Sequence, residues 1–124
     1  ECGLQPLLIL SGSAVVGCDP SLMGLGPVHA VRRLGRDVND YDWIELNEAF
    51  AAQTIACLRP LEIPLEKLNV HGGAIALGHP IGASGARILV TLLNALRQRG
   101  GRIGIAALCL GGGEAVAVAI ELLG

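Results

Sequence analysis

The sequence predicts an α/β fold with a five-stranded mixed sheet in the order βαβαβαββ. Short apolar runs alternate with helical segments along the chain, and glycine or proline residues mark most of the junctions between them. This alternation is typical of folds in which helices pack on a largely parallel sheet. A turn of three glycines before the last apolar run predicts that the final two strands pair antiparallel.

Five segments have the apolar and β-branched composition that is typical of strands. They are residues 7–16, 43–46, 68–70, 102–110 and 114–123. The first lies between Pro6 and Gly17 and ends in β-branched residues, and its apolar composition predicts a buried strand. The fourth is also expected to be buried, whereas the last alternates between larger and smaller residues.

Three segments between these strands are predicted to be helical. They are residues 28–34, 47–59 and 83–99. Pro27 suits the start of the first helix. Asn47 caps helices well and Glu48 suits a first turn, so the second helix is expected to begin there and to end before Pro60. The third is the most regular, because its leucine and isoleucine residues follow the spacing of a buried helical face.

Composition excludes several classes of protein. The chain has 124 residues, of which 52% are hydrophobic and 16% charged, so it is too apolar for a disordered protein. No apolar stretch approaches the roughly 20 residues of a membrane span. Nine Lys and Arg residues against eleven Asp and Glu residues give no nucleic-acid footprint. The length suits one domain with an aliphatic core.

The four cysteines predict neither a metal site nor a disulfide framework. They are Cys2, Cys18, Cys57 and Cys109, and none forms a C-x-x-C pair or has a histidine at zinc-ligand spacing. A chain of this length can form a core without disulfides, so we expect reduced thiols and a cytoplasmic location. The first residues lack the basic region of a signal peptide. Because Glu1 is not an initiator, we expect a processed chain or a piece of a longer one.

Three polar side chains stand where strands end or helices begin, which is where sites in α/β folds usually lie. They are Asn47, His79 and Cys109. Each has an ordinary alternative: a helix cap, an exposed loop histidine and an inert buried thiol. A cysteine beside the free amides of a glycine turn, with a histidine at a helix start, suits acyl transfer. The alternatives are a phosphate cradle or tight packing, although no P-loop motif is present.

Several near-literal blocks resemble the C-terminal half of a thiolase, the family of acetyl-CoA acetyltransferases and 3-ketoacyl-CoA thiolases. The blocks are Asn47–Gln53, Asn69–Arg87 and Cys109–Gly113, with an upstream extension over Asp19–Pro27. The resemblance covers essentially all of residues 1–124. It implies a thiolase-like half with helices on both faces of its sheet, and an active site shared with a second, similar half.

The resemblance also implies roles for individual residues. His79 would activate a nucleophilic cysteine, and Cys109 would move the proton at the substrate α-carbon. Asn47 would hold the water of one oxyanion hole, and the Gly111 amide would contribute to the second. The residues that would line the acyl or pantetheine end of the pocket are Phe50 and Met23.

The same resemblance implies coenzyme A thioesters as substrates, no metal or prosthetic group, and a homo-oligomer that is a dimer or a tetramer. The family's nucleophile belongs to the N-terminal half, and no block of that kind occurs here. We therefore expect an inactive C-terminal domain that needs the N-terminal half, in the same or another chain. The alternatives are a non-catalytic half-domain that binds coenzyme A or pairs with a subunit, and a nucleotide-binding module.

Four features depart from the family pattern. The segment at residues 32–42 is shorter than usual, His71 stands where asparagine is common, and His29 replaces a small residue or proline. Glu114 and Ala115 replace the usual glutamine or methionine followed by glycine. We expect His71 to be a hydrogen-bonding loop residue and His29 to be exposed.

Overall fold

Four strands form one mixed sheet in the order β1-β4-β3-β2 in the computed structural model, which describes residues 2–124. The strands are β1 (Leu8–Gly17), β2 (Trp43–Leu46), β3 (Ile103–Leu110) and β4 (Glu114–Leu122). Strands β2 and β3 are parallel, while β3–β4 and β4–β1 are antiparallel. The α/β class and the final antiparallel pair are confirmed, but the sheet is less parallel than predicted.

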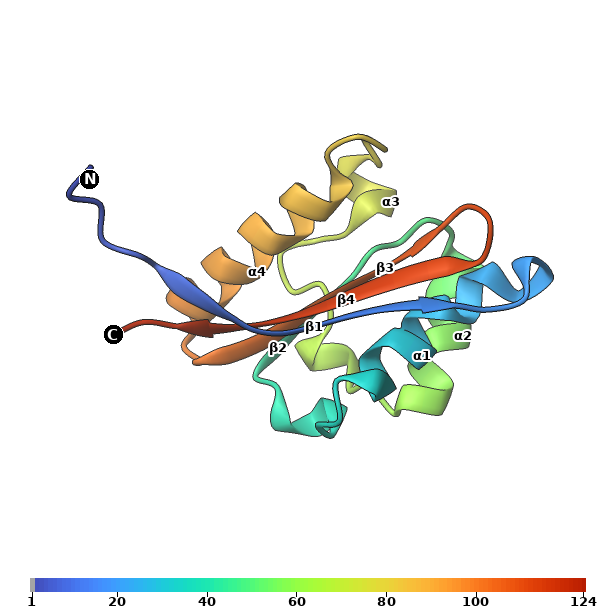
Figure 1. Ribbon diagram of the computed structural model, residues 1–124, viewed down its shortest axis with the longest axis horizontal. Coiled ribbons are helices and arrows are strands. Elements are labelled where there is room, and N and C mark those ends of the chain that lie inside the picture. Colours follow the sequence, from blue (N-terminus) through green and yellow to red (C-terminus); the bar gives the residue numbers. More distant parts are fainter. Residues whose placement is uncertain (1) are drawn as a thin grey trace.

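Helices cover both faces of this sheet, with α1 and α2 on one side and α4 on the other (Figure 1). They are α1 (Gly26–Arg33), α2 (Ala51–Leu61), the single turn α3 (Ala74–Leu77) and α4 (Ser84–Arg99). Three 3-10 helices connect them: η1 (Pro20–Leu25), η2 (Val38–Asp40) and η3 (Leu65–Lys67). No helix within residues 2–124 is long and apolar enough to cross a membrane.

The alternation of side chains along β3 builds a separate core on each face. Ile105 and Ala107 join the cluster under α1 and α2, whereas Ala106 joins the cluster under α4. The α4 cluster also includes Ile88 and Leu92, which confirms the helical face that the sequence predicted. The central strand β3 is therefore buried on both sides, as expected.

The predicted fifth strand at residues 68–70 is wrong, because only one parallel bridge joins Leu68 to Ile44. Asn69 leaves the extended conformation, with φ at 44°. Its side chain then takes the place of a backbone partner for Leu46. Oδ1 accepts from the Leu46 N–H at 2.9 Å, and Nδ2 donates to the Leu46 carbonyl at 2.9 Å.

The second helix also differs from its prediction. It begins at Ala51 after the N-cap residue Phe50, so Asn47 is not a helix cap. It continues past Pro60 to Leu61, because a proline in the last turn removes only one of the hydrogen bonds of the helix. Glu62, with φ at 52°, ends the helix in the left-handed conformation.

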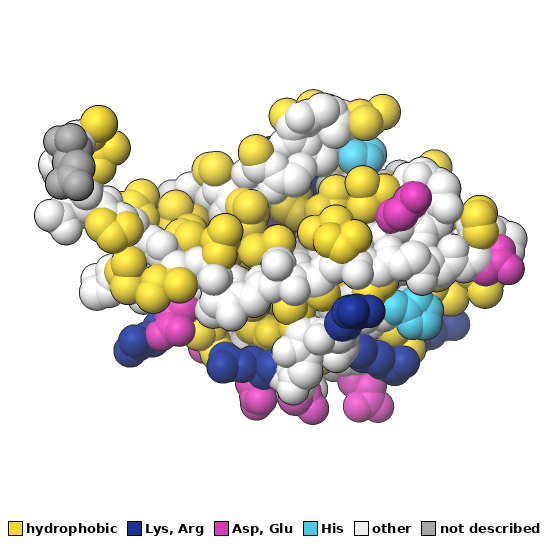
Figure 2. Space-filling model, viewed as in Figure 1, with side chains coloured by type: hydrophobic (Ala, Val, Ile, Leu, Met, Phe, Trp, Pro, Cys, Tyr) yellow, Lys and Arg dark blue, Asp and Glu magenta, His cyan; other side chains and the backbone are white. Residues whose placement is uncertain are grey.

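Strand β1 is an edge strand with mostly exposed residues, so its predicted burial is wrong. Within residues 2–124, β4 is the only strand that pairs with β1, and α4 packs over β2 and β3 instead. Large apolar side chains are consequently exposed on or beside β1, namely Leu7, Ile9, Leu10 and Val15. Figure 2 shows apolar side chains spread over the face of the molecule that β1 and β4 cross.

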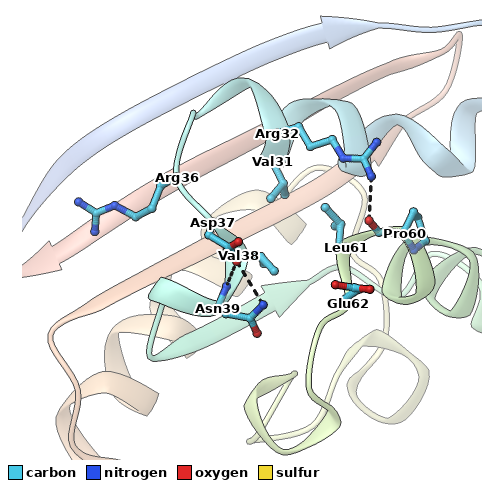
Figure 3. Close-up of a pocket in the computed structure, with 9 residues that line it drawn as sticks. All are labelled: Val31, Arg32, Arg36, Asp37, Val38, Asn39, Pro60, Leu61 and Glu62. Carbon is cyan, nitrogen blue, oxygen red and sulfur yellow. Dashed lines mark hydrogen bonds between the residues drawn. The ribbon is translucent and has the colours of Figure 1, made fainter.

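The short connection after α1 packs against the end of α2 and encloses a small cavity of about 200 Å³ (Figure 3). The Arg32 guanidinium donates to the Pro60 carbonyl at 2.8 Å. Asp37 Oδ1 accepts from the backbone N–H of Asn39 at 2.8 Å, which starts η2. These polar groups hold the connection in place, so we assign the cavity to the fold.

A buried charge pair lies between the sheet and α4. Glu45 in β2 is 1% exposed, and its Oε2 lies 3.6 Å from Nη1 of Arg87 in α4. Burial raises the pKa of the Glu45 carboxyl to about 7. The positive charge of Arg87 opposes this rise and the negative charge of Glu48 adds to it. Loss of water around the carboxylate therefore outweighs its attraction to the guanidinium.

Replacing Asn69 by alanine should destabilise the chain by at least about 2 kcal/mol, because it leaves the N–H and carbonyl of Leu46 without partners. Urea denaturation followed by circular dichroism measures the change. Asn94→Ala is the matched control, because Asn94 donates only to a carbonyl within α4. Equal stability of the Asn69→Ala and Asn94→Ala variants would contradict the proposed strand-like role of Asn69.

The raised pKa of Glu45 predicts a pH dependence of stability. Between the usual value of 4.5 and about 7, the folded chain keeps the Glu45 proton while the unfolded chain has lost it. The free energy of unfolding should therefore fall as the pH rises through this window, by about 3 kcal/mol. Glu45→Gln mimics the protonated form and should remove this loss. Parallel pH profiles of the two proteins, measured by urea denaturation, would contradict the prediction.

Candidate active site

The carboxyl ends of the parallel strands β2 and β3 meet at one edge of the sheet, and the predicted polar residues gather there. Asn47 directly follows β2, and its backbone N–H donates to the Ala107 carbonyl of β3 at 2.9 Å. Cys109 lies two residues further along β3. Ligands of α/β sheets commonly bind outside such strand ends. The side chain of Asn47 is fully buried at this position.

His79 reaches the same edge from the loop between α3 and α4. Its Nε2 lies 3.5 Å from Nδ2 of Asn47, and its Nδ1 lies 2.5 Å from Oγ of Ser84. The Ser84 hydroxyl donates to the Pro80 carbonyl at 3.0 Å, so its oxygen is free to accept the Nδ1–H of His79. The hydrogen-bond network thus assigns the Nδ1–H tautomer, in which Nε2 can take up a proton.

Glu48 holds the segment that carries this loop. Its Oε1 accepts from Nδ2 of Asn69 at 3.1 Å, and its Oε2 accepts from the backbone N–H of Ile75 at 2.9 Å. A Cβ atom at Gly73 would overlap the Glu48 carboxylate, so this close approach requires glycine. The Asn47–Gln53 block and the glycine-rich block are therefore joined through one carboxylate.

A cavity of about 340 Å³ lies beside these groups. Its lining residues are Met23, Ala49, Phe50, His79, Ile81, Leu108, Cys109, Leu110 and Gly111. The cavity thus brings together five of the six predicted site residues, and the sixth, Asn47, contacts it through His79. The lining is mainly apolar, and Phe50 and Ile81 are largely exposed at its rim.

Cys109 is a buried thiol rather than an activated nucleophile. It is 7% exposed, and this burial raises the pKa of its thiol. A backbone hydrogen bond lowers the pKa by less than burial raises it, and the neighbouring Cys18 adds a still smaller rise. The arrangement suits a group that keeps a proton at neutral pH and exchanges it with a bound molecule.

The other cysteines have different surroundings. Cys57 is fully buried, its pKa is raised mainly by burial, and its thiol donates to the Gly24 carbonyl at 3.0 Å. This packing supports a structural role. Cys2 is exposed and Cys18 is half-buried. Within residues 2–124, no group of three or more His, Cys, Asp or Glu side chains could hold a metal ion.

Two further glycines shape the turn beside Cys109. Gly112 and Gly113 both have φ at 96°, a conformation that other residues rarely adopt. The Gly113 carbonyl accepts from the Cys18 N–H at 2.6 Å, which ties the turn to the end of β1. Gly111 remains exposed at the cavity, with open space around its Cα.

Four polar side chains support the site although sequence reasoning gave none of them a part in it. They are Glu45, Glu48, Ser84 and Arg87. Glu48 lies before α2 rather than in its first turn. One signal was present: Glu45 interrupts an otherwise apolar strand, which is unusual for a residue that is to be buried. Ser84 and Arg87 are three residues apart and therefore share one face of α4.

Comparison with known proteins gives a consistent result. The family description "Thiolase, C-terminal domain" matches residues 4–122. An acetyl-CoA acetyltransferase of Chromobacterium violaceum is 53% identical over 125 residues, which cover 98% of this chain and 32% of that protein. The chain therefore spans about a third of the length of this curated relative.

Solved structures agree with this assignment. The acetyl-CoA acetyltransferase of Bacillus anthracis has a TM-score of 0.93 and 49% identity, covering 98% of this chain and 32% of the other. Human mitochondrial 3-ketoacyl-CoA thiolase in complex with CoA has a TM-score of 0.93 and 47% identity, covering 97% and 32% respectively. The chain thus belongs to the thiolase family and corresponds to its C-terminal domain.

Proposed function

We propose that this chain is the catalytic C-terminal domain of an acyltransferase that makes or cleaves 3-ketoacyl-CoA, by Claisen condensation of acetyl-CoA or by thiolysis. The observation that carries the proposal is the convergence of Asn47, His79 and Cys109 at one sheet edge, beside a largely apolar cavity. Family membership and the names of the relatives support the same chemistry.

His79 is proposed to act as the base for a nucleophilic cysteine. The Nδ1–H is engaged by Ser84, so the lone pair on Nε2 faces Asn47 and the cavity. A thiol that approaches Nε2 can transfer its proton there and attack the carbonyl carbon of a thioester or 3-ketoacyl-CoA. The contact with Ser84 fixes the ring orientation that this transfer needs.

Cys109 is proposed to move the proton at the substrate α-carbon. In the cleavage direction its S–H gives the proton to the departing carbon. In condensation its thiolate removes a proton from the methyl group of acetyl-CoA. Microscopic reversibility requires the same atom in both directions. The raised pKa keeps this thiol protonated at neutral pH, which favours the first of these steps.

Negative charge develops on the thioester oxygen during both steps, and the proposed site stabilises it with hydrogen-bond donors. The Gly111 N–H contributes to one oxyanion hole. A water held by Asn47 contributes to the other, together with the N–H that Nε2 of His79 carries once it has taken up the thiol proton. A preorganised donor of this kind lowers the barrier by roughly 3–4 kcal/mol. Phe50 and Met23 are proposed to contact the acyl or pantetheine portion, because both line the cavity.

The nucleophilic cysteine is proposed to come from an N-terminal thiolase half, in the same or another chain. The chain spans only about a third of its relatives' length. Exposed apolar side chains on β1 offer a surface for a covering partner, and we propose a dimeric or tetrameric assembly. Since proton transfer requires a reduced Cys109, we place the protein in a reducing compartment such as the cytoplasm.

A chimera tests the catalytic proposal. Residues 1–124 would replace the matching segment of the Chromobacterium violaceum acetyltransferase, which is 53% identical to them. We expect the chimera to cleave acetoacetyl-CoA with added coenzyme A, as followed by absorbance. His79→Ala and Cys109→Ala should each lower kcat at least about 100-fold, because each removes a group that transfers protons.

Matched variants separate chemistry from folding. His29→Ala and Cys2→Ala remove the same side-chain types at exposed positions and should keep the chimera's activity. An inactive but folded chimera that still binds coenzyme A in calorimetry would favour the alternative of a non-catalytic half-domain. Full activity of Cys109→Ala or His79→Ala would overturn the proposed roles.

The open sheet face predicts that the 124-residue chain self-associates when it is alone. Light scattering should give an average mass that rises with concentration, because the apolar side chains of β1 are otherwise left in water. Co-expression with the N-terminal two-thirds of the Chromobacterium enzyme should suppress this association. Val15→Lys should reduce the association of the chain alone, whereas a monodisperse wild-type monomer at high concentration would contradict the prediction.

A further inference from the structure

Arg87 is a strongly polar group near the site whose placement the proposed chemistry does not use. It projects from the first turn of α4 into the layer between the helix and β2, and its side chain is 20% exposed. Nη2 lies 3.5 Å from Oδ1 of Asn47, and Nη1 lies 3.6 Å from Oε2 of Glu45. The guanidinium thus bridges a buried carboxylate and the fully buried amide of Asn47.

A role in stability alone does not explain the buried Glu45–Arg87 pair, because taking its charges out of water costs folding free energy. Both carboxylate oxygens of Glu45, together with Nε and Nη1 of Arg87, are buried without a hydrogen-bond partner. Buried pairs of this kind are often no more stable than apolar residues of similar volume. Unsatisfied buried groups in a native fold call for an explanation, and function is one of the common ones.

The hydrogen bonds from Arg87 to the Pro80 carbonyl form one series in which each group donates to the next acceptor or is positioned by it. Arg87 donates to Oδ1 of Asn47, so Nδ2 of Asn47 turns toward Nε2 of His79. His79 then donates its Nδ1–H to Ser84, and Ser84 donates to the Pro80 carbonyl. Each link has one donor and one acceptor only when the Asn47 amide has this orientation and His79 is the Nδ1–H tautomer.

Exchanging the Oδ1 and Nδ2 positions of Asn47 would break its contacts with both Arg87 and His79. The Asn47 NH₂ group would face the guanidinium, placing donor against donor, and Oδ1 would face the lone pair of Nε2. A guanidinium cannot reverse its role, because it carries no acceptor and stays charged. Glu45 keeps that charge in place, because its carboxylate is the only acidic partner of Arg87 among the described residues.

We propose that Arg87, held by Glu45, is a positioning residue that fixes the Asn47 amide so that its NH₂ group faces Nε2 of His79 and the cavity. Arg87 touches no substrate in this proposal and acts only through Asn47. The inference rests on the proposed function for its catalytic consequence, whereas the amide and imidazole geometry is a property of the chain itself.

A double-mutant cycle in the active chimera tests the catalytic part. Arg87→Met should lower kcat about tenfold with little change in KM, because a mobile amide no longer presents its donor. In the Asn47→Ala background, the same substitution should have almost no further effect. An equal loss of kcat in both backgrounds would overturn the proposal, since a purely structural role of Arg87 does not require Asn47.

The control substitution is Arg97→Met, which removes an arginine from the exposed part of the same helix and should leave kcat unchanged. Because Arg87→Met leaves Glu45 buried without its partner, the Glu45→Gln/Arg87→Met double variant guards against loss of folding. It should show the same tenfold loss of kcat as Arg87→Met.

A second measurement does not depend on activity. Nitrogen-15 NMR at alkaline pH, where imidazole is neutral, reports which ring nitrogen of each of the three histidines carries the proton. The 124-residue chain carries Val15→Lys in this measurement to limit its self-association. Wild-type His79 should be the Nδ1–H tautomer, and Glu45→Gln/Arg87→Met should shift it toward Nε2–H, since Oδ1 of Asn47 can then accept. The peaks are assigned with His29→Gln and His71→Gln.

The two measurements separate the possible failures. An inactive wild-type chimera would overturn the proposed function, while the NMR result would still decide the role of Arg87. An unchanged His79 tautomer in the folded double variant would overturn the positioning role even if the chimera were active. A shifted tautomer together with non-additive kcat values would support both proposals.

Discussion

The contact of Asn69 with the end of β2 is the interaction on which the rest of the site depends. Strand β2 has only four residues, and Leu46 at its end would have an unpaired N–H and carbonyl without the Asn69 side chain. The same amide donates to Glu48, which also accepts from Ile75 at the start of α3. These contacts fix residues 69–75 beside the end of β2. They also position the following loop, which places His79 next to Asn47 although the glycines of that loop favour mobility.

The elements that sequence patterns predicted well are those whose own residues determine them. Helix α4 follows from its regular apolar spacing, and β3 from an apolar run with glycines on both sides. The predictions failed where tertiary contacts decide. The Asn69 side chain pairs with Leu46 where a fifth strand was predicted. Asn47 contacts Arg87 and His79 instead of capping α2. The exposure of β1 could not be predicted, because apolar composition does not show whether a partner covers the strand.

Residues of the candidate site were likewise predictable only where a local sequence motif marks them. His79, Cys109 and Gly111 were identified from motif blocks, and the structure places all three around one cavity. Their supporting residues could not be identified in this way, because Arg87 and Glu45 are 42 positions apart and meet only when α4 packs over β2. The two faces of the sheet also differ in a way that no local pattern shows. The buried polar side chains of α2, Gln53 and Thr54, are uncharged, whereas the layer under α4 carries the buried charge pair.

The alternation of side chains explains why the site lies at the sheet edge rather than on either face. Cys109 shares its face of β3 with Ile105 and Ala107, under α1 and α2, while Asn47 points to the α4 side, where Arg87 contacts it. These two groups can act on one molecule only beyond the strand ends, where the cavity lies. Its lining includes no Lys, Arg, Asp or Glu. In the proposed reaction, the groups of this chain that can stabilise the developing charge are amides and the His79 ring, whose effect depends on fixed orientation. The placement of the Asn47 amide therefore matters to the proposed chemistry.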